Sequence, residues 1–260
     1  MIINTVSNHS YMGARNNYAT RISLIGDSTI LIISEFFAIL AGLLSQAILT
    51  RGLSAEEYGG WIVVLDAFLT IFLLADPGVS TIIGRELPSN NSKSLQFMKS
   101  ALVIQILFVF PILLILLVSS DVLSSALNFP IVPLFLICSG SIFMASSSVY
   151  RSFLRSTGRA NWEATMRVMD RVILSFGYIL AYINQGTIMH YSLAIAIAPS
   201  ITLTGLISLS FIHARRMSSD EFSADKSLYP ISLVRRSIPF VFYILCWNLL
   251  FRIDKFLLFI

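Results

Sequence analysis

The chain has 260 residues, of which 56% are apolar and only 12% are charged, roughly half the charged share of an ordinary soluble domain. Its mean hydropathy is +0.79, and a soluble fold cannot keep that much apolar surface away from water. The 13 Gly, 8 Pro and 2 Cys are too few for a disordered chain or a small disulfide scaffold. We therefore expect an integral membrane protein.

Seven apolar runs have about the 20-residue length that a membrane-spanning helix needs. They lack the alternation of apolar and polar residues that a membrane β-barrel shows, so we predict an all-α membrane protein with a bundle of about seven transmembrane helices. The predicted spans are Ile30–Thr50, Trp61–Ile83, Ser100–Ser119, Ile131–Tyr150, Met166–Ile183, Tyr191–Ile212 and Ser237–Ile260.

The basic residues are distributed unevenly along this pattern. Fourteen of the 18 Lys and Arg fall in the N-terminal segment and in every second connection, including Arg151, Arg155, Arg159 and Arg167 after the fourth span. Short cytoplasmic loops carry such an excess, so we predict a cytoplasmic N-terminus and a multi-pass protein of the inner membrane. Because topology explains these residues, the net charge of +4 does not indicate a nucleic-acid partner.

Ionisable and polar side chains inside the spans are the candidates for a functional site, because burying them in hydrocarbon is costly. Glu35 and Gln46 share a helix face with Gly42, and Pro77-Gly78 after Asp76 predicts a break in the second span. Broken helices in membranes line protein or water-filled cavities. The predicted substrate- or ion-binding cavity comprises Glu35, Gln46, Asp66, Asp76, Arg252 and Asp254.

Other polar groups are interpreted as structural. Asp170 and Arg171 are expected to anchor the fifth span at the interface, with Arg167 as a partner of Asp170. The serines of residues 146–148 are attributed to close helix packing. The chain shows no catalytic motif and no metal-ligand spacing, so we expect no enzyme activity, no catalytic residues, no bound metal and no cofactor.

Several motifs, in order, resemble a family pattern of membrane proteins. They are Arg51–Gly59 (RGLSAEEYG), Leu74–Ser80 (LADPGVS) with Arg85-Glu86, Phe153–Arg159 (FLRSTGR), Ser237–Phe240 (SIPF) and Arg252–Lys255 (RIDK). The sequence resembles the N-terminal part of the Wzx-type oligosaccharide-lipid flippases of polysaccharide biosynthesis, in the MATE/MurJ-like superfamily. The order Gly52-Leu53-Ser54 and Pro77 depart from the usual pattern.

The resemblance implies two lobes of about six helices each that work by alternating access. It divides this chain into a cytoplasmic N-terminal segment (1–29), a six-helix N-lobe (30–213), a cytoplasmic linker (214–236) and the first helix of a C-lobe (237–260). By that template the chain is a truncated transporter, and whether it is a natural product and active alone stays open.

The function implied by the resemblance is flipping of a lipid-linked oligosaccharide for surface O-antigen or exopolysaccharide synthesis. Its implied partners are this substrate, the bilayer and other polysaccharide assembly proteins, with Arg252 as a cation for the pyrophosphate. The spans hold more acids than bases, however, which keeps a MATE-like proton- or cation-coupled exporter of organic cations as the alternative. A membrane glycosyltransferase would need a large outer loop, and a non-transporting structural protein also stays open.

Overall fold

The computed structural model describes residues 3–72, 76, 78–89 and 94–217, together with Arg235 and Cys246. In this part of the chain the regular structure is helical, with α1 (Ile3–Gly52), α2 (Ala55–Phe72), α3 (Val79–Glu86), a short 3-10 turn (Leu87–Ser89), α4 (Ser94–Leu127), α5 (Ile131–Ser156), α6 (Ala160–Ile183) and α7 (Ile188–Met217). Gly26–Gly52 of α1 and the whole of α4, α5 and α7 are long and apolar enough to cross a membrane. The predicted all-α membrane fold is confirmed.

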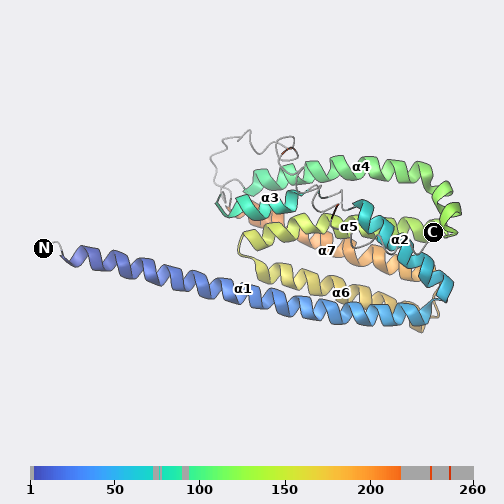
Figure 1. Ribbon diagram of the computed structural model, residues 1–260, viewed down its shortest axis with the longest axis horizontal. Helices are drawn as coiled ribbons and strands as arrows, with labels where there is room; N and C mark the ends of the chain where they lie inside the picture. Colours follow the sequence, from blue (N-terminus) through green and yellow to red (C-terminus); the bar gives the residue numbers. More distant parts are fainter. Residues whose placement is uncertain are drawn as a thin grey trace.

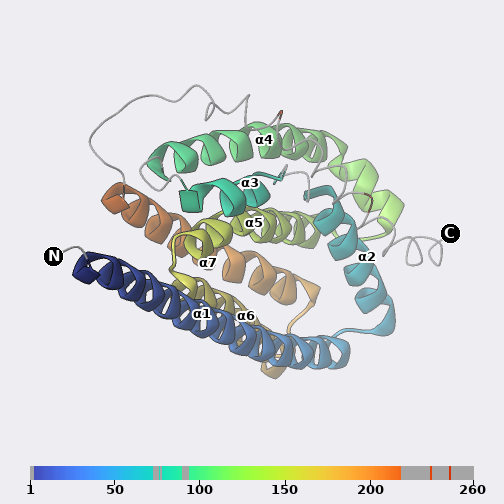
Figure 2. The same cartoon turned by 60° about the vertical axis from the view of Figure 1, so that its left-hand side comes forward.

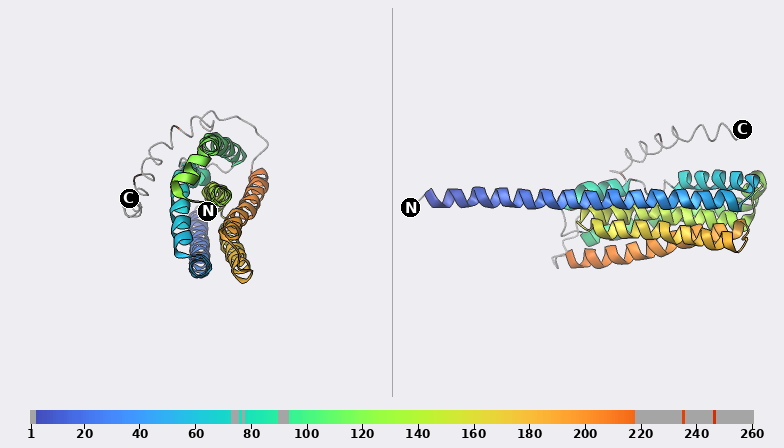
Figure 3. Two further views of the ribbon diagram at one scale, coloured as in Figure 1. Left: turned by 90° about the vertical axis from the view of Figure 1, so that its right-hand side faces the viewer. Right: turned by 90° about the horizontal axis from the view of Figure 1, so that it is seen from below.

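The helices lie side by side in an elongated bundle, with α5 at its centre (Figures 1 and 3). Helix α5 packs against α7, α3 and α2, while α1 pairs with α6, and α6 also contacts α7. Short connections between α4, α5, α6 and α7 make these helices antiparallel neighbours. The first part of α1 extends well beyond the bundle at the N-terminal end (Figure 3).

Helices α5 and α7 approach each other very closely at one glycine. A Cβ added to Gly140 would lie 2.3 Å from the carbonyl oxygen of Ile195 in α7, so any side chain there would push the two helices apart. Further along α5, Tyr150 and Phe153 are buried in a core cluster with Met98 of α4 and Leu206 of α7. This packing fixes the rotation of α5 and so decides which of its faces stays free of the core.

The predicted break within the second apolar run is confirmed. Helix α2 ends at Phe72 and α3 begins at Val79, so the expected single span of Trp61–Ile83 is two helices (Figure 2). Gly78, which precedes α3, has a φ of 75°, a left-handed conformation that glycine adopts without a steric penalty. The break separates α3 from the axis of α2 and lets it lie along α5.

Hydroxyl groups join α1 to α6. Ser45 and Ser175 share a hydrogen bond of 2.8 Å between their Oγ atoms, and Ser175 also donates to the carbonyl of Ala41 at 3.1 Å. Small residues allow helices to approach closely in a membrane, and such hydrogen bonds add to their association. The pairing brings Glu35 of α1 beside Arg167 of α6.

Most of the last part of the chain, to which the predicted linker and seventh span belong, lies outside the described residues. The expected linker is described only at 214–217 and Arg235, and the expected seventh span only at Cys246. The division into an N-lobe, a linker and a C-lobe helix therefore stays a prediction.

Candidate functional site

The last third of α5 alternates pairs of polar and apolar residues. Residues 147–156 read SSVYRSFLRS, and the apolar pairs Val149-Tyr150 and Phe153-Leu154 are all buried. Residues four apart share a helix face, so the apolar pairs form one stripe toward the core. The serines and arginines between them form a second stripe, in which every member except Ser147 is at least partly exposed.

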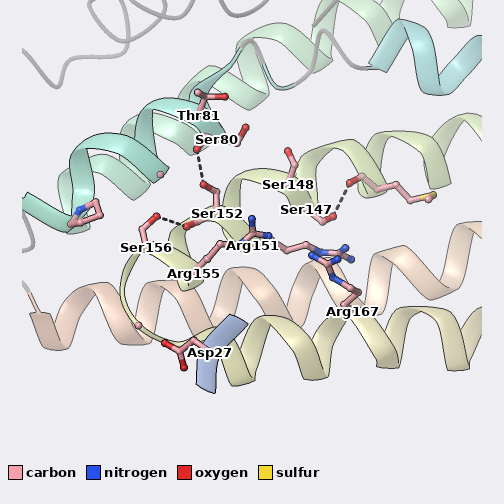
Figure 4. Close-up of a pocket in the computed structure, with 14 residues that line it drawn as sticks. Asp27, Ser80, Thr81, Ser147, Ser148, Arg151, Ser152, Arg155, Ser156 and Arg167 are labelled. Atoms are coloured by element: carbon pink, nitrogen blue, oxygen red, sulfur yellow. Dashed lines mark hydrogen bonds between the residues drawn. The ribbon is translucent and has the colours of Figure 1, made fainter. Parts of the chain in front are cut away.

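This polar stripe forms one wall of a cavity of about 1140 Å³. The other walls come from α1, α3, the residues after α3 and α5, and α6. Figure 4 shows the serines of α3 and α5 on one side of the space, Arg167 on α6, and Asp27 on α1. The lining residues are Asp27, Ser80, Thr81, Gly84, Pro88, Met144, Ser147, Ser148, Arg151, Ser152, Arg155, Ser156, Gly158 and Arg167.

Two hydroxyls of α5 hold the start of α3 at the cavity. Ser148 donates to Asp76 Oδ2 at 2.8 Å, and Asp76 Oδ1 accepts the backbone N–H of Ser80 at 3.2 Å. Ser152 donates to the carbonyl oxygen of Ser80 at 2.6 Å (Figure 4). Asp76 thus satisfies one free N–H in the first turn of α3 and ties the broken helix to α5.

A buried carboxylate holds two of the three cavity arginines. Glu163 of α6 has no exposed surface. Its Oε2 accepts from Arg155 Nε at 2.9 Å, and its Oε1 accepts from one terminal nitrogen each of Arg155 and Arg167, the latter at 2.8 Å. Arg167 also forms an ion pair with Glu35 of α1. The arrangement links α5, α6 and α1 through four alternating charges.

The third cavity arginine, Arg151, lies beside a second buried acid. One of its terminal nitrogens is 3.8 Å from Asp170 Oδ2, which is an ion pair but too long for a hydrogen bond. Asp170 is 5% exposed and accepts a hydrogen bond from Thr202 of α7 at 3.0 Å. The structure therefore pairs Asp170 with Arg151 of α5, whereas the spacing along α6 suggested Arg167.

The lining favours an anionic, hydroxyl-bearing ligand. Three guanidinium groups and one carboxylate, that of Asp27, line the cavity. The carboxylates of Glu163 and Asp170 do not line it, because they are buried next to the arginines. The Arg155 side chain is 56% exposed although Glu163 fixes two of its nitrogens. Guanidinium groups bind phosphate and carboxylate through paired hydrogen bonds, and serine hydroxyls can donate to or accept from sugar hydroxyls.

The structure brings two of the sequence-predicted site residues to this cavity. Asp76 is hydrogen-bonded to Ser148 and Ser80, and Glu35 is ion-paired with Arg167, so both contact residues that line the cavity without lining it themselves. The other described candidates do not line it: Gln46 is exposed on α1, and Asp66 is half-buried on α2. Arg252 and Asp254 lie outside the described residues.

Most of the lining is not predicted by the sequence pattern. The distribution of basic residues assigns Arg151, Arg155 and Arg167 to membrane topology, and the serines of residues 146–148 are attributed to packing. A usable signal was present, because polar and apolar pairs alternate with a period of four across residues 147–156, which places all the polar pairs on one helix face. Glu163 gave no such signal, since its burial depends on partners from two helices.

Among the described residues, no group of three or more His, Cys, Asp or Glu side chains is arranged to hold a metal ion. No curated protein and no solved structure matches the chain. The family model of the polysaccharide biosynthesis proteins matches residues 24–259, nearly the whole sequence. The chain is a membrane protein that belongs to the polysaccharide biosynthesis protein family.

Proposed function

We propose that the protein moves a lipid-linked oligosaccharide across the membrane by alternating access, and that the cavity lined by the polar stripe of α5 holds the phosphate and sugar part of this substrate. The observation that carries the proposal is a lining of three arginines and a row of serines within a membrane bundle. Family membership supports a role in polysaccharide synthesis or translocation. Such transport breaks no bond, so it needs polar groups for binding and no catalytic residue.

The outer surface of the bundle suits the lipid part of this substrate. Large apolar side chains are exposed along α1 and α4, among them Phe36, Phe37, Leu107 and Phe110. These surfaces match hydrocarbon and not water. A lipid tail can stay in the bilayer while the polar head group enters the cavity, which avoids the cost of moving charged groups through hydrocarbon.

The surplus of acids in the spans favoured an exporter of organic cations, but the described cavity gives that alternative little support. Two of the five acids in that count, Glu35 and Asp170, form ion pairs with arginines. Arginine side chains, not these carboxylates, form most of the charged lining. The guanidinium groups of the lining can donate charge-assisted hydrogen bonds to a phosphate, which they cannot do to a cation.

Replacing Arg151 tests the proposal in cells that lack their own copy of the gene. Arg151 lines the cavity, its side chain is 21% exposed, and no hydrogen bond to Asp170 occupies the terminal nitrogen that lies 3.8 Å from that carboxylate. Losing a hydrogen bond to a charged group costs about 1.5–3 kcal/mol, so Arg151→Ala should lower surface glycan by roughly tenfold or more. Lipid-linked oligosaccharide should accumulate on the cytoplasmic side when strains with equal amounts of the protein in the membrane are compared.

Arg215→Ala is the matched control, since Arg215 is an exposed arginine near the end of α7 and does not line the cavity. It should leave surface glycan at the wild-type level. Normal surface glycan in the Arg151→Ala strain would remove this cavity from the transport pathway. Proton-coupled efflux of organic cations by the purified protein, without glycan loss in the variant, would favour the exporter.

A further inference from the structure

Arg167 is shared between two carboxylates that differ greatly in exposure. Glu163 has no exposed surface, whereas the Glu35 side chain is 52% exposed. Arg167 itself lines the cavity and is 19% exposed. One of its acids is therefore part of the protein interior, and the other is half-exposed on the surface of α1.

Glu35 is held there mainly by the packing of its helix. The neighbouring positions Ser34 and Ala38 are buried against the bundle, and the Ser45–Ser175 hydrogen bond ties α1 to α6 independently of any charge. Breaking the Glu35–Arg167 ion pair therefore leaves the contact between the two helices in place. The pair is free to open without unfolding this part of the protein.

The balance of charge changes when an anion enters the cavity. Glu35, Arg167, Glu163 and Arg155 contain two acids and two bases, so the chain of four is neutral when no ligand is present. A phosphate group beside Arg155 and Arg167 makes it net negative, and like charges a few ångströms apart repel strongly away from bulk water. One carboxylate then has to give up its guanidinium partner.

Glu35 is the carboxylate that can leave. A carboxylate removed from its partner needs a new polar environment, and a half-exposed side chain next to the cavity can move to one, whereas a fully buried side chain cannot. Glu163 also accepts hydrogen bonds from both arginines, whereas Glu35 contacts only Arg167 in the described ion pairs. The cost of release is therefore much lower for Glu35.

We propose that Glu35 is a resident competitor of the ligand: it pairs with Arg167 when the cavity is empty, and the anionic phosphate of the ligand displaces it. This inference rests on the proposed function and names the group that exchanges. Loading of the cavity thereby releases one of the ties between α1 and α6, the two helices that face each other along one side of the bundle.

The test is the affinity of the full chain for phosphate compounds in nanodiscs of phosphatidylcholine. The probes are inorganic pyrophosphate and farnesyl pyrophosphate, which separate a free anion from an isoprenyl-linked one. Removing the competitor with Glu35→Gln should tighten the Kd of the bound probe by about twofold to fivefold, the range that a half-exposed ion pair supports. Glu56→Gln, at an exposed glutamate of α2, is the matched control and should leave the Kd unchanged.

A gain of affinity cannot arise from a damaged fold, so a tighter Kd supports the exchange. A gain with both probes identifies the phosphate itself as the displacing group, and a gain with farnesyl pyrophosphate alone identifies an isoprenyl-linked phosphate. An unchanged or weaker Kd in Glu35→Gln, with normal binding by the wild type, overturns the inference alone. If the wild type binds neither probe, the anion-binding cavity and the inference both fall.

Discussion

Glu163 is the residue whose loss should disturb the cavity most directly. Its carboxylate is fully buried and accepts three hydrogen bonds from two guanidinium groups. Glu163→Ala removes these acceptors and leaves Arg155 and Arg167 without the charge that orients them. We therefore expect a loss of stability together with a loss of anion binding.

The expected magnitude follows from the exposure of the two arginines. Removing one partner from a fully buried ion pair costs about 3–5 kcal/mol. Arg155 is 56% exposed and can be hydrated by water, so its share is small, whereas Arg167 is 19% exposed and keeps Glu35 as a partner. We expect Glu163→Ala to lower the free energy of unfolding by about 2–3 kcal/mol, after discounting the screened pair.

Glu163→Gln should cost less, about 1–2 kcal/mol, because the amide keeps one acceptor oxygen but points N–H donors at an arginine. The measurement is denaturant unfolding in mixed lipid micelles, with Glu56→Ala as an exposed control. A change below about 0.5 kcal/mol in Glu163→Ala, the range of ordinary surface substitutions, would refute the assignment of Glu163 as the buried anchor of both arginines.

Two further predictions concern the framework of the cavity. Gly140→Ala places a methyl group 2.3 Å from the Ile195 carbonyl oxygen. This overpacking should outweigh the gain in helix propensity and lower the free energy of unfolding by about 1–2 kcal/mol. Gly42→Ala, with open space around its Cβ, is the control and should be neutral or slightly stabilising; equal effects of the two substitutions would contradict the close approach of α5 and α7. Asp76→Leu removes the acceptor of Ser148 and should lower the free energy of unfolding by about 1 kcal/mol, whereas an unchanged value would argue against the tie between α3 and α5.

The sequence predicted the helices and the break well because both depend on local properties. The length of an apolar run sets a membrane helix, and Pro77-Gly78 marks an interruption wherever the chain folds. Six of the expected runs are helical in the described residues, with the second divided into α2 and α3; of these helices α1, α4, α5 and α7 are long and apolar enough to cross a membrane. These features required no knowledge of which helices become neighbours.

The cavity could not be predicted in the same way, because it depends on contacts between distant segments. Arg151 and Arg155 fit the rule for cytoplasmic loops and also line the cavity, so their charge alone does not separate the two roles. The partner of Asp170 is Arg151 and not a neighbour on its own helix, since the packing of α5 against α6 and α7 decides which charges meet. Glu163 became recognisable only once its burial was visible.

The central claim is most directly tested by transport of a fluorescent isoprenyl-pyrophosphate-linked oligosaccharide in proteoliposomes. The fraction of substrate that reaches the outer leaflet is measured with a glycosidase that cannot cross the membrane. We predict that the wild-type protein raises this fraction with time above protein-free vesicles and that Arg151→Ala reduces the rate by about tenfold or more. A wild-type rate equal to that of protein-free vesicles, with the protein correctly inserted, would contradict the account.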